Sequence, residues 1–271
     1  VPTPAFGLYE SITRLLRGVP VSLPTEEYDF QIDPQALAAA ITPRTKAIIL
    51  TSPNNPTGCI YTRETLDTIH DVLKDKPIFV FCDDVYRELV YTAGYHSFAE
   101  YQDMRDRIIV IQSFSKPYAM TGWRLGYAAA PAVILEQMLK IHQYAIMCAP
   151  TTSQYAAVSA MKNGDPDVAM MRESYNQRRR FLLHAFAEMG IECFEPLGAF
   201  YTFPNIKRFG MTSEEFATRL LQEEKVAVVP GTAFGDCGEG FVRISYAYSL
   251  NNLKEALGRI QRFVSRLDGK A

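Results

Sequence analysis

The sequence lacks several features that mark particular classes of protein. Its 271 residues contain no apolar run of transmembrane length, no secretory leader and no methionine at the start. Five cysteines are scattered along the chain, and they form no pair or cluster with the spacing of a zinc site. We therefore expect no metal and no membrane span, and free thiols in a reducing compartment such as the cytoplasm.

An excess of one charge is also lacking. The chain has 28 basic and 30 acidic residues, which gives a formal net charge of −2. This balance gives no electrostatic reason to bind nucleic acid or an anionic membrane. The one tight basic run, Arg178 to Arg180, is expected on a solvated helix face. At 271 residues, the chain is long enough to bury one large core or two smaller ones, and its 48% of hydrophobic residues is ordinary for a globular protein.

Three short, continuous apolar runs stand in the first half of the chain, at residues 47–51 (AIILT), 78–82 (IFVFC) and 108–112 (IIVIQ). Such runs are typical of strands that are buried on both faces of a parallel sheet. Between the first two runs, a helix is expected to begin at the capping residue Thr62. This alternation predicts an open α/β sheet flanked by helices.

The second half of the chain is mostly helical up to residue 189 and mixed after it. A long amphipathic stretch runs from about Asp167 to Met189, and short strand-like pieces then alternate with helices. Thr212 to Glu215 read as a capping box for the first of these helices. We predict a large domain over residues 1–165 and a C-terminal α+β domain over residues 166–271 that includes the long connecting helix.

Polar groups follow each of the three apolar runs. Asn55 follows the first run, Asp83 and Tyr86 follow the second, and Lys116 follows the third. Because parallel strands present their carboxyl ends at one edge of a sheet, we expect these side chains to converge there. Taken singly, each has an ordinary structural explanation as a turn, cap or core residue. Their coincidence at successive strand ends favours a site.

The segment after the third run has the chemistry of a Schiff-base site. Ser113, Ser115, Lys116 and Arg124 fall within one loop. The lysine amine can condense with an aldehyde, while hydroxyl groups and a guanidinium suit a phosphate dianion. A solvated surface turn would explain this loop alone equally well. The polar residues that follow the other two predicted strands favour a cofactor site over a surface turn.

Four segments carry a resemblance to a known family: SPNNPTG (52–58), CDDVY (82–86), SFSKPYAMTGWRLGY (113–127) and FVRISYA (241–247). They resemble, in order, the signature segments of the fold-type I pyridoxal-phosphate aminotransferases of class I/II, the aspartate aminotransferase superfamily. The resemblance covers nearly the whole chain. It implies an α/β fold with a mostly parallel sheet flanked by helices, together with a C-terminal α+β small domain.

The resemblance also assigns roles to the polar residues. Lys116 would hold pyridoxal 5'-phosphate as a Schiff base and then move a proton between the substrate and the cofactor. Asp83 would pair with the pyridine nitrogen, which keeps the ring an electron sink. Tyr86 and Asn55 would hydrogen-bond the ring oxygen. Asp84 stands where the family usually has Glu, and we expect no consequence from this departure.

The remaining family positions concern the phosphate and the substrate. Ser113, Ser115 and Arg124 would bind the cofactor phosphate, and Phe6 would stack on its ring. Arg243 would clamp the substrate α-carboxylate in a bidentate fork, with Asn55 and Gly198 beside the substrate. No metal is implied.

The implied activity is amino-group transfer between an aspartate- or aromatic-type amino acid and a 2-oxo acid, in a cytoplasmic protein that forms a homodimer when full length. Two alternatives stay open: a β C–S lyase that uses pyridoxal phosphate on the same fold, and an aminotransferase-like sensor domain of a transcription regulator. Because Arg243 would recognise any α-carboxylate, the amino donor stays open as well.

In this family a further segment precedes the one that matches residues 2–10 (PTPAFGLYE). It supplies a helix and strand of the large domain, a turn that caps the phosphate, and a tyrosine donated across the dimer. The sequence begins after that segment. We therefore expect an N-terminally truncated large domain with weakened cofactor affinity and reduced activity.

Overall fold

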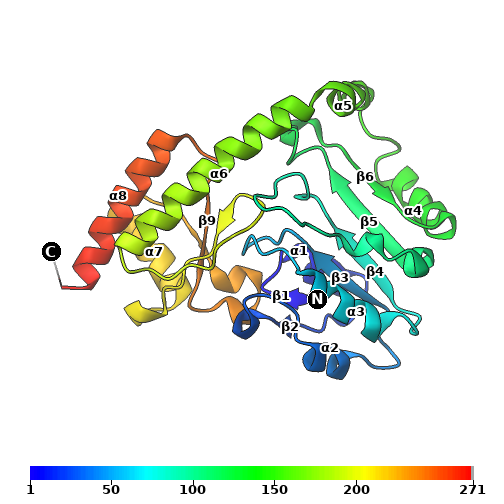
Figure 1. Cartoon of the computed structure of the whole chain (residues 1–271), viewed down its shortest axis with the longest axis horizontal. Coiled ribbons are helices and arrows are strands. Elements are labelled where there is room, and N and C mark those ends of the chain that lie inside the picture. The colour runs from blue at the N-terminus through cyan, green and yellow to red at the C-terminus, as the bar shows by residue number, and fades with distance from the viewer. Residues whose placement is uncertain (270–271) are drawn as a thin grey trace. The chain divides into compact units, whose positions relative to one another are not determined.

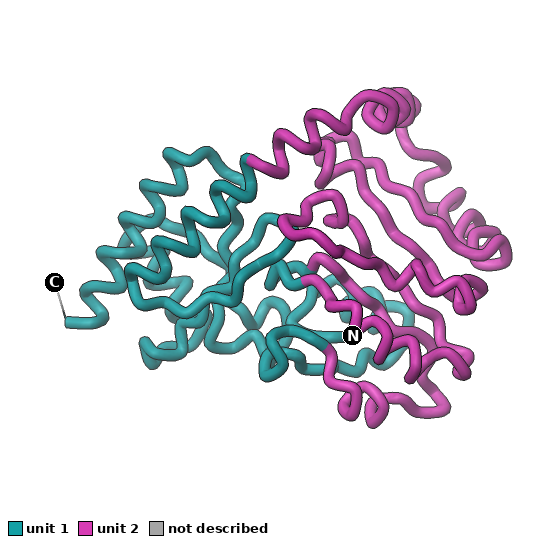
Figure 2. The backbone as a smooth tube through the Cα atoms, viewed as in Figure 1, with its two compact units in different colours: residues 1–31, 54–59, 174–271 teal, residues 32–53, 60–173 magenta. Residues whose placement is uncertain are grey.

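The computed structural model of the protein describes residues 1–269 and divides the chain into two compact units, which Figure 2 colours separately. Unit 1 comprises residues 1–31, 54–59 and 174 onward, and unit 2 comprises residues 32–53 and 60–173. Neither unit is one continuous stretch of sequence. The domain boundary expected near residue 165 stays a prediction.

Unit 2 is built on a four-stranded sheet in the order β3-β4-β5-β6 (Figure 1). The strands β3 (Ala47–Thr51), β4 (Phe79–Asp83) and β5 (Ile108–Ser113) are parallel, and β6 (Gly126–Ala129) runs antiparallel to β5. The three predicted strands and their parallel pairing are confirmed. In this register Thr51 pairs with Asp83, and Asp83 with Ile111, so the ends of the parallel strands are aligned.

Two helices of unit 2 begin at the caps that local chemistry favours. In α2 (Pro34–Ala40), the Asp33 side chain accepts a hydrogen bond from the Ala36 amide. In α3 (Arg63–Leu73), the Thr62 side chain accepts one from the Thr65 amide, which confirms the predicted helix start. One face of α3 is buried through Leu66, Ile69 and Leu73.

The helix α4 (Ala132–Ala145) differs from α3, because no residue of this fully described helix is buried. It is followed by α5 (Thr151–Asn163) and then by α6 (Asp165–Glu188), whose residues continue from unit 2 into unit 1. Large apolar side chains of α4 are exposed: Val133, Leu135, Met138, Leu139, Ile141 and Tyr144. An exposed apolar surface of this kind is typical of a face that another chain or segment covers.

Unit 1 contains a short parallel pair and a three-stranded antiparallel sheet. The pair joins β1 (Pro2–Thr3) to β2 (Leu23–Pro24), and α1 (Leu8–Leu15) lies between them in sequence. The sheet has the order β7-β9-β8, with β7 (Tyr201–Thr202), β9 (Val242–Ser245) and β8 (Val229–Pro230). Phe30, Cys59, Phe203 and Phe234 form a buried cluster in this unit.

The C-terminal helices are α7 (Ser213–Glu224) and α8 (Leu250–Leu267). Thr212 caps α7 through a hydrogen bond from the Glu215 amide, as its sequence predicts. Leu253, Leu257 and Ile260 are on the buried face of α8. Short 3-10 helices occupy Glu26–Tyr28, Phe98–Glu100, Gln102–Arg107, Thr121–Trp123, Lys207–Phe209, Gly231–Phe234 and Asp236–Gly238. Within residues 1–269, the structure has no helix that is both long and apolar enough to cross a membrane.

Candidate functional site

Unit 2 carries the predicted residues that follow β4 and β5. Asp83 ends β4, and Tyr86 lies in the turn after it, which a hydrogen bond from the Arg87 amide to the Asp84 carbonyl closes at 2.9 Å. The Lys116 Nζ atom lies over the Tyr86 ring, 5.5 Å from the ring centroid. Tyr86 is buried and Lys116 is partly buried. The structure therefore brings together the lysine and the phenol that follow neighbouring strands.

The loop that carries Lys116 is folded around a buried apolar cluster. Phe114 and Met120 pack with Ala157 beneath it, and the Phe114 amide donates to the Leu125 carbonyl at 3.2 Å. At its start, the Ser115 amide donates to the Ser113 hydroxyl at 3.1 Å. This packing holds the lysine segment in a defined shape at the end of β5.

Arg124 closes the same loop in a left-handed backbone conformation, with φ at 52°. Its guanidinium is exposed and donates one hydrogen bond to the Thr121 carbonyl at 2.7 Å. Ser113 and Ser115 are partly buried. The loop thus offers two hydroxyl groups, an amine and a guanidinium, the donor set that suits a phosphate-bearing aldehyde.

Asp84, which stands where the family usually has Glu, is buried in the structure, and the expectation that this departure has no consequence stays a prediction. The Asp84 side chain is 3% exposed, and the Ser97 hydroxyl donates to its carboxylate at 2.6 Å. Burial raises the pKa of Asp84 to about 6, against the lowering effect of the Ser97 hydrogen bond and the Arg87 charge. Sequence reasoning missed this residue because an acidic pair gives no sign of which member is buried.

Unit 1 carries the predicted substrate-side residues. Arg243 lies on β9 and donates from Nη1 to the Asn55 side-chain oxygen at 2.9 Å. Its guanidinium carbon is 4.5 Å from the centroid of the Tyr201 ring and 4.9 Å from that of the Phe234 ring. Its Nε is buried and has no hydrogen-bond acceptor among residues 1–269. A carboxylate would satisfy this donor.

Gly198 is held against the segment that contains Asn55. The Leu197 and Gly198 amides both donate to the Gly58 carbonyl, at 2.9 and 3.0 Å. Gly58 has φ of +71°, and a Cβ placed on it would lie 2.3 Å from the Pro196 Cβ. Only glycine fits this close approach in this backbone conformation.

Arg179 corrects the expectation that the run from Arg178 to Arg180 is a solvated helix face. Arg179 is 6% exposed, and its Nη1 donates to the Glu195 carboxylate at 2.7 Å and to the Pro196 carbonyl at 3.1 Å. Its Nε donates to the Asn176 side chain at 3.0 Å. Arg179 thereby fixes the turn that leads to Gly198, through partners distant from it in the sequence.

Phe6 is exposed and lies just before α1, with its ring edge-on to Tyr9 at 5.9 Å between centroids. The Ala5 amide before it donates to the Phe234 carbonyl at 2.8 Å, and the Phe234 ring is one of those that flank Arg243. In the described part of the chain, no three His, Cys, Asp or Glu side chains gather as metal ligands would.

Solved structures define the class of the fold. The aromatic aminotransferase of Pyrococcus horikoshii OT3 superposes with a TM-score of 0.95 at 42% identity, over 98% of this chain and 72% of that chain. The aspartate aminotransferase of Thermus thermophilus with maleate superposes with a TM-score of 0.91 at 34% identity, over 96% of this chain and 68% of that chain. The fold is that of a pyridoxal-phosphate-dependent transferase.

The sequence comparisons identify the family. A profile of aminotransferase class I and II matches residues 1–260, and this chain belongs to that family, which uses pyridoxal phosphate. YugH of Bacillus subtilis is 47% identical over 267 residues, which are 98% of this chain and 69% of YugH. The aspartate aminotransferase of Pyrococcus abyssi is 43% identical, over 97% of this chain and 68% of its own length.

Proposed function

We propose that this chain transfers the amino group of an aspartate- or aromatic-type amino acid to a 2-oxo acid, with Lys116 at the centre of the site. The observation that carries the proposal is the position of Lys116 at the end of β5, with its Nζ over the Tyr86 ring. The substrate class is supported by relatives named aspartate aminotransferase, at 43% identity, and aromatic-amino-acid aminotransferase 2, at 41% identity.

The donors and acceptors of unit 2 fit pyridoxal phosphate. Asp83 supplies a carboxylate suited to a protonated pyridine nitrogen, and Tyr86 supplies a phenol suited to the ring oxygen. Ser113, Ser115 and Arg124 supply the donors that a phosphate dianion requires. Pyridoxal phosphate contributes an aldehyde that condenses with amines and a ring that accepts electrons from the substrate Cα.

The residues of this chain then have separate tasks. Lys116 would hold the cofactor covalently, and its amine, once the substrate amine has displaced it, would move a proton between the substrate Cα and the cofactor. Asp83 would keep the pyridine nitrogen protonated, and Tyr86 and Asn55 would each be suited to donate a hydrogen bond to the ring oxygen. Phe6 would supply an aromatic ring to stack on that of the cofactor.

Arg243 binds the α-carboxylate of the substrate. Asn55 holds one arm of the guanidinium, while the Tyr201 and Phe234 rings hold its plane, so little side-chain freedom is lost on binding. The buried Nε gains the acceptor that it lacks among the described residues. The Gly198 backbone lines the substrate beside it.

The test is to locate the lysine that binds the cofactor. The chain is incubated with pyridoxal phosphate, reduced with borohydride and digested, and the labelled peptide is identified by mass spectrometry. We expect the label at Lys116, its loss in Lys116→Ala, and its retention in Lys162→Ala, which alters an exposed lysine of the same unit. Labelling at other lysines, or no labelling, would overturn the proposal.

A second measurement distinguishes transamination from elimination and identifies the amino donor. Absorbance is followed while a panel of amino acids is added, and the oxo-acid product and ammonia are assayed. Conversion of the bound cofactor to its amine form without ammonia release supports transamination, whereas ammonia release indicates elimination. The homodimer and the cytoplasmic location stay predictions, of which light scattering on the purified protein tests the first.

A further inference from the structure

Asp84 is a buried carboxyl group beside Asp83 that none of the roles proposed above uses. It is 3% exposed, and the Ser97 hydroxyl donates to its Oδ2 at 2.6 Å. The Tyr95 hydroxyl also hydrogen-bonds this carboxyl group. Burying an ionisable group is costly, and the hydrogen bonds from two side chains offset part of that cost and fix the carboxyl group in place.

The backbone of Asp84 is fixed on both sides. Its amide donates to the Ile111 carbonyl of β5 at 3.1 Å, which extends the parallel ladder by one residue beyond β4. Its carbonyl accepts from the Arg87 amide at 2.9 Å, which closes the turn that carries Tyr86. Because successive side chains of a strand point to opposite faces of the sheet, the Asp84 side chain is anchored on one face of the strand end, and the Asp83 side chain is on the other face.

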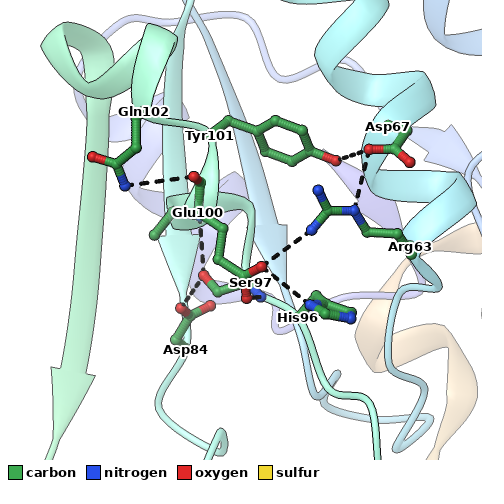
Figure 3. A network of polar contacts seen from close by, with 9 residues as sticks. Arg63, Asp67, Asp84, His96, Ser97, Glu100, Tyr101 and Gln102 are labelled. Carbon is green, nitrogen blue, oxygen red and sulfur yellow. Dashed lines mark hydrogen bonds and ion pairs between the residues drawn. The ribbon is translucent and has the colours of Figure 1, made fainter.

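Ser97 is itself held in place by a network that Figure 3 shows. It caps the short helix Phe98–Glu100: its hydroxyl accepts from the Ala99 amide and its amide donates to the Glu100 carboxylate, both at 3.1 Å. The other Glu100 oxygen accepts from Arg63 at 3.1 Å, and His96 Nδ1 lies 3.1 Å from the same oxygen. Since Arg63 begins α3, the anchor of Asp84 is built on a helix of the same unit.

Tyr95 connects the same carboxyl group to the end of β3. Its hydroxyl donates to the Ser52 carbonyl at 2.8 Å, and the Ser52 hydroxyl accepts from the Tyr61 amide at 3.1 Å. Ser52 directly follows β3. Through Asp84, the carboxyl ends of β3, β4 and β5 are therefore joined by hydrogen bonds.

We propose that Asp84 is a positioning residue for Asp83. By fixing the peptide between the two residues and the turn that follows, it sets the position from which the Asp83 carboxylate meets the pyridine nitrogen of pyridoxal phosphate. A functional carboxylate needs this support, because small misplacements at a reacting group are costly. This inference rests on the proposed function, since it takes Asp83 to be the partner of that nitrogen.

The test is a double-mutant cycle on the dissociation constant of the 271-residue chain for pyridoxal phosphate, measured by titrating the protein fluorescence. We expect Asp84→Ala to weaken binding about tenfold in the parent chain but less than about twofold in Asp83→Ala, because the residue it positions is then gone. Asp84→Glu, which keeps the carboxyl group, should bind within about threefold of the parent. Asp106→Ala, which alters an exposed carboxyl group of the same unit, should leave binding unchanged.

Equal weakening by Asp84→Ala in both backgrounds would overturn the positioning role, since a loss of general stability acts on both alike. If Asp83→Ala weakens binding and Asp84→Ala does not, this inference alone is wrong. If Asp83→Ala has no effect, or the parent chain binds no cofactor, the proposed function is contradicted and this inference falls with it. Should Asp84→Ala fail to fold, Ser97→Ala takes its place in the cycle, with the same expected coupling.

Discussion

The two arginines that we assign to anions, Arg243 in unit 1 and Arg124 in unit 2, are held in opposite ways. Arg243 lies between the Tyr201 and Phe234 rings and donates to Asn55, whereas Arg124 is exposed and donates to a carbonyl within its own loop. A guanidinium held by packing is ready for a carboxylate before binding, while an exposed one must be ordered by its ligand. The carboxylate site that we propose at Arg243 is thus more preorganised than the phosphate site that we propose at Arg124.

The largest effect should come from removing the guanidinium of Arg243, which is the more preorganised of the two. Arg243→Ala removes a charge-assisted fork and leaves Asn55 without its donor, so KM for the amino donor should rise about 100- to 1,000-fold, with a smaller change in kcat. Arg124→Ala should act on cofactor affinity instead, by about tenfold. Steady-state kinetics and cofactor titrations separate the two effects.

The matched control for both variants is Arg44→Ala, at an exposed arginine of unit 2, which should change neither quantity. If Arg243→Ala and Arg124→Ala alter KM and cofactor affinity to the same extent, the contrast between a packed and an exposed anion site is wrong.

Close packing in unit 1 predicts the next effect, at Gly58. Gly58→Ala places a Cβ 2.3 Å from the Pro196 Cβ at a positive φ, so the free energy of unfolding should fall by about 3 kcal/mol. Gly94 in unit 2 has φ of +85° and nothing within 4 Å of an added Cβ, so Gly94→Ala should cost only about 1 kcal/mol. Urea unfolding of both variants measures the difference. Equal losses would show that backbone strain alone, without the close approach, explains Gly58.

Unit 2 holds a buried acid beside its candidate site, and this predicts a pH effect. The pKa of Asp84 is raised from 3.8 to about 6 in the folded chain, so the folded state binds the proton more tightly than the unfolded state. Between about pH 4 and pH 6, the contribution of Asp84 to stability should therefore fall as pH rises, by about 2 to 3 kcal/mol in all.

Asp84→Asn cannot titrate, so this part of the pH dependence should be missing from its unfolding curves. The comparison requires urea unfolding of the parent and the variant at several pH values over this range. Parallel stability profiles for the two proteins would contradict the raised pKa.

The smallest effect should come from replacing Arg179. This residue supports the turn before Gly198 but is not among the residues that we propose to contact the substrate. Arg179→Gln leaves the Pro196 carbonyl short of a donor, so the free energy of unfolding should fall by about 1 to 2 kcal/mol and KM should rise a few-fold. Arg180→Gln alters an exposed neighbour and should cost less than about 0.5 kcal/mol. If both variants cost the same, the buried contacts of Arg179 contribute nothing measurable.

Much of unit 2 could be predicted from the sequence because its signals are local. The run at residues 47–51 matches β3 from end to end, and Thr62 caps α3 as expected. The local patterns also predict neighbouring parallel strands whose carboxyl ends lie at one edge of the sheet. Lys116 and Tyr86, which follow two of these strands, could therefore be expected to lie close together. Residue types and spacing contain this information directly.

The parts that could not be predicted depend on contacts between distant residues. The rings around Arg243 come from Tyr201 and Phe234, and the partners of Arg179 come from residues 195 and 196. Neither contact leaves a periodic trace in the sequence. The same holds for Asp84, whose burial depends on Ser97 and Tyr95 in a loop with no regular pattern.

The division of the chain into units has a consequence for dissecting the protein. The backbone passes from one unit to the other at residues 31–32, 53–54, 59–60 and 173–174. No single cut can therefore release either unit intact, and a fragment with one new terminus that contains all of unit 2 also contains residues of unit 1. The six residues from Asn54 to Cys59, which include Asn55 and Gly58, belong to unit 1, although the residues on both sides of them in the sequence belong to unit 2. Because Arg243 follows all of unit 2 in the sequence, its hydrogen bond with Asn55 can form during synthesis only after the sheet of unit 2 has been made.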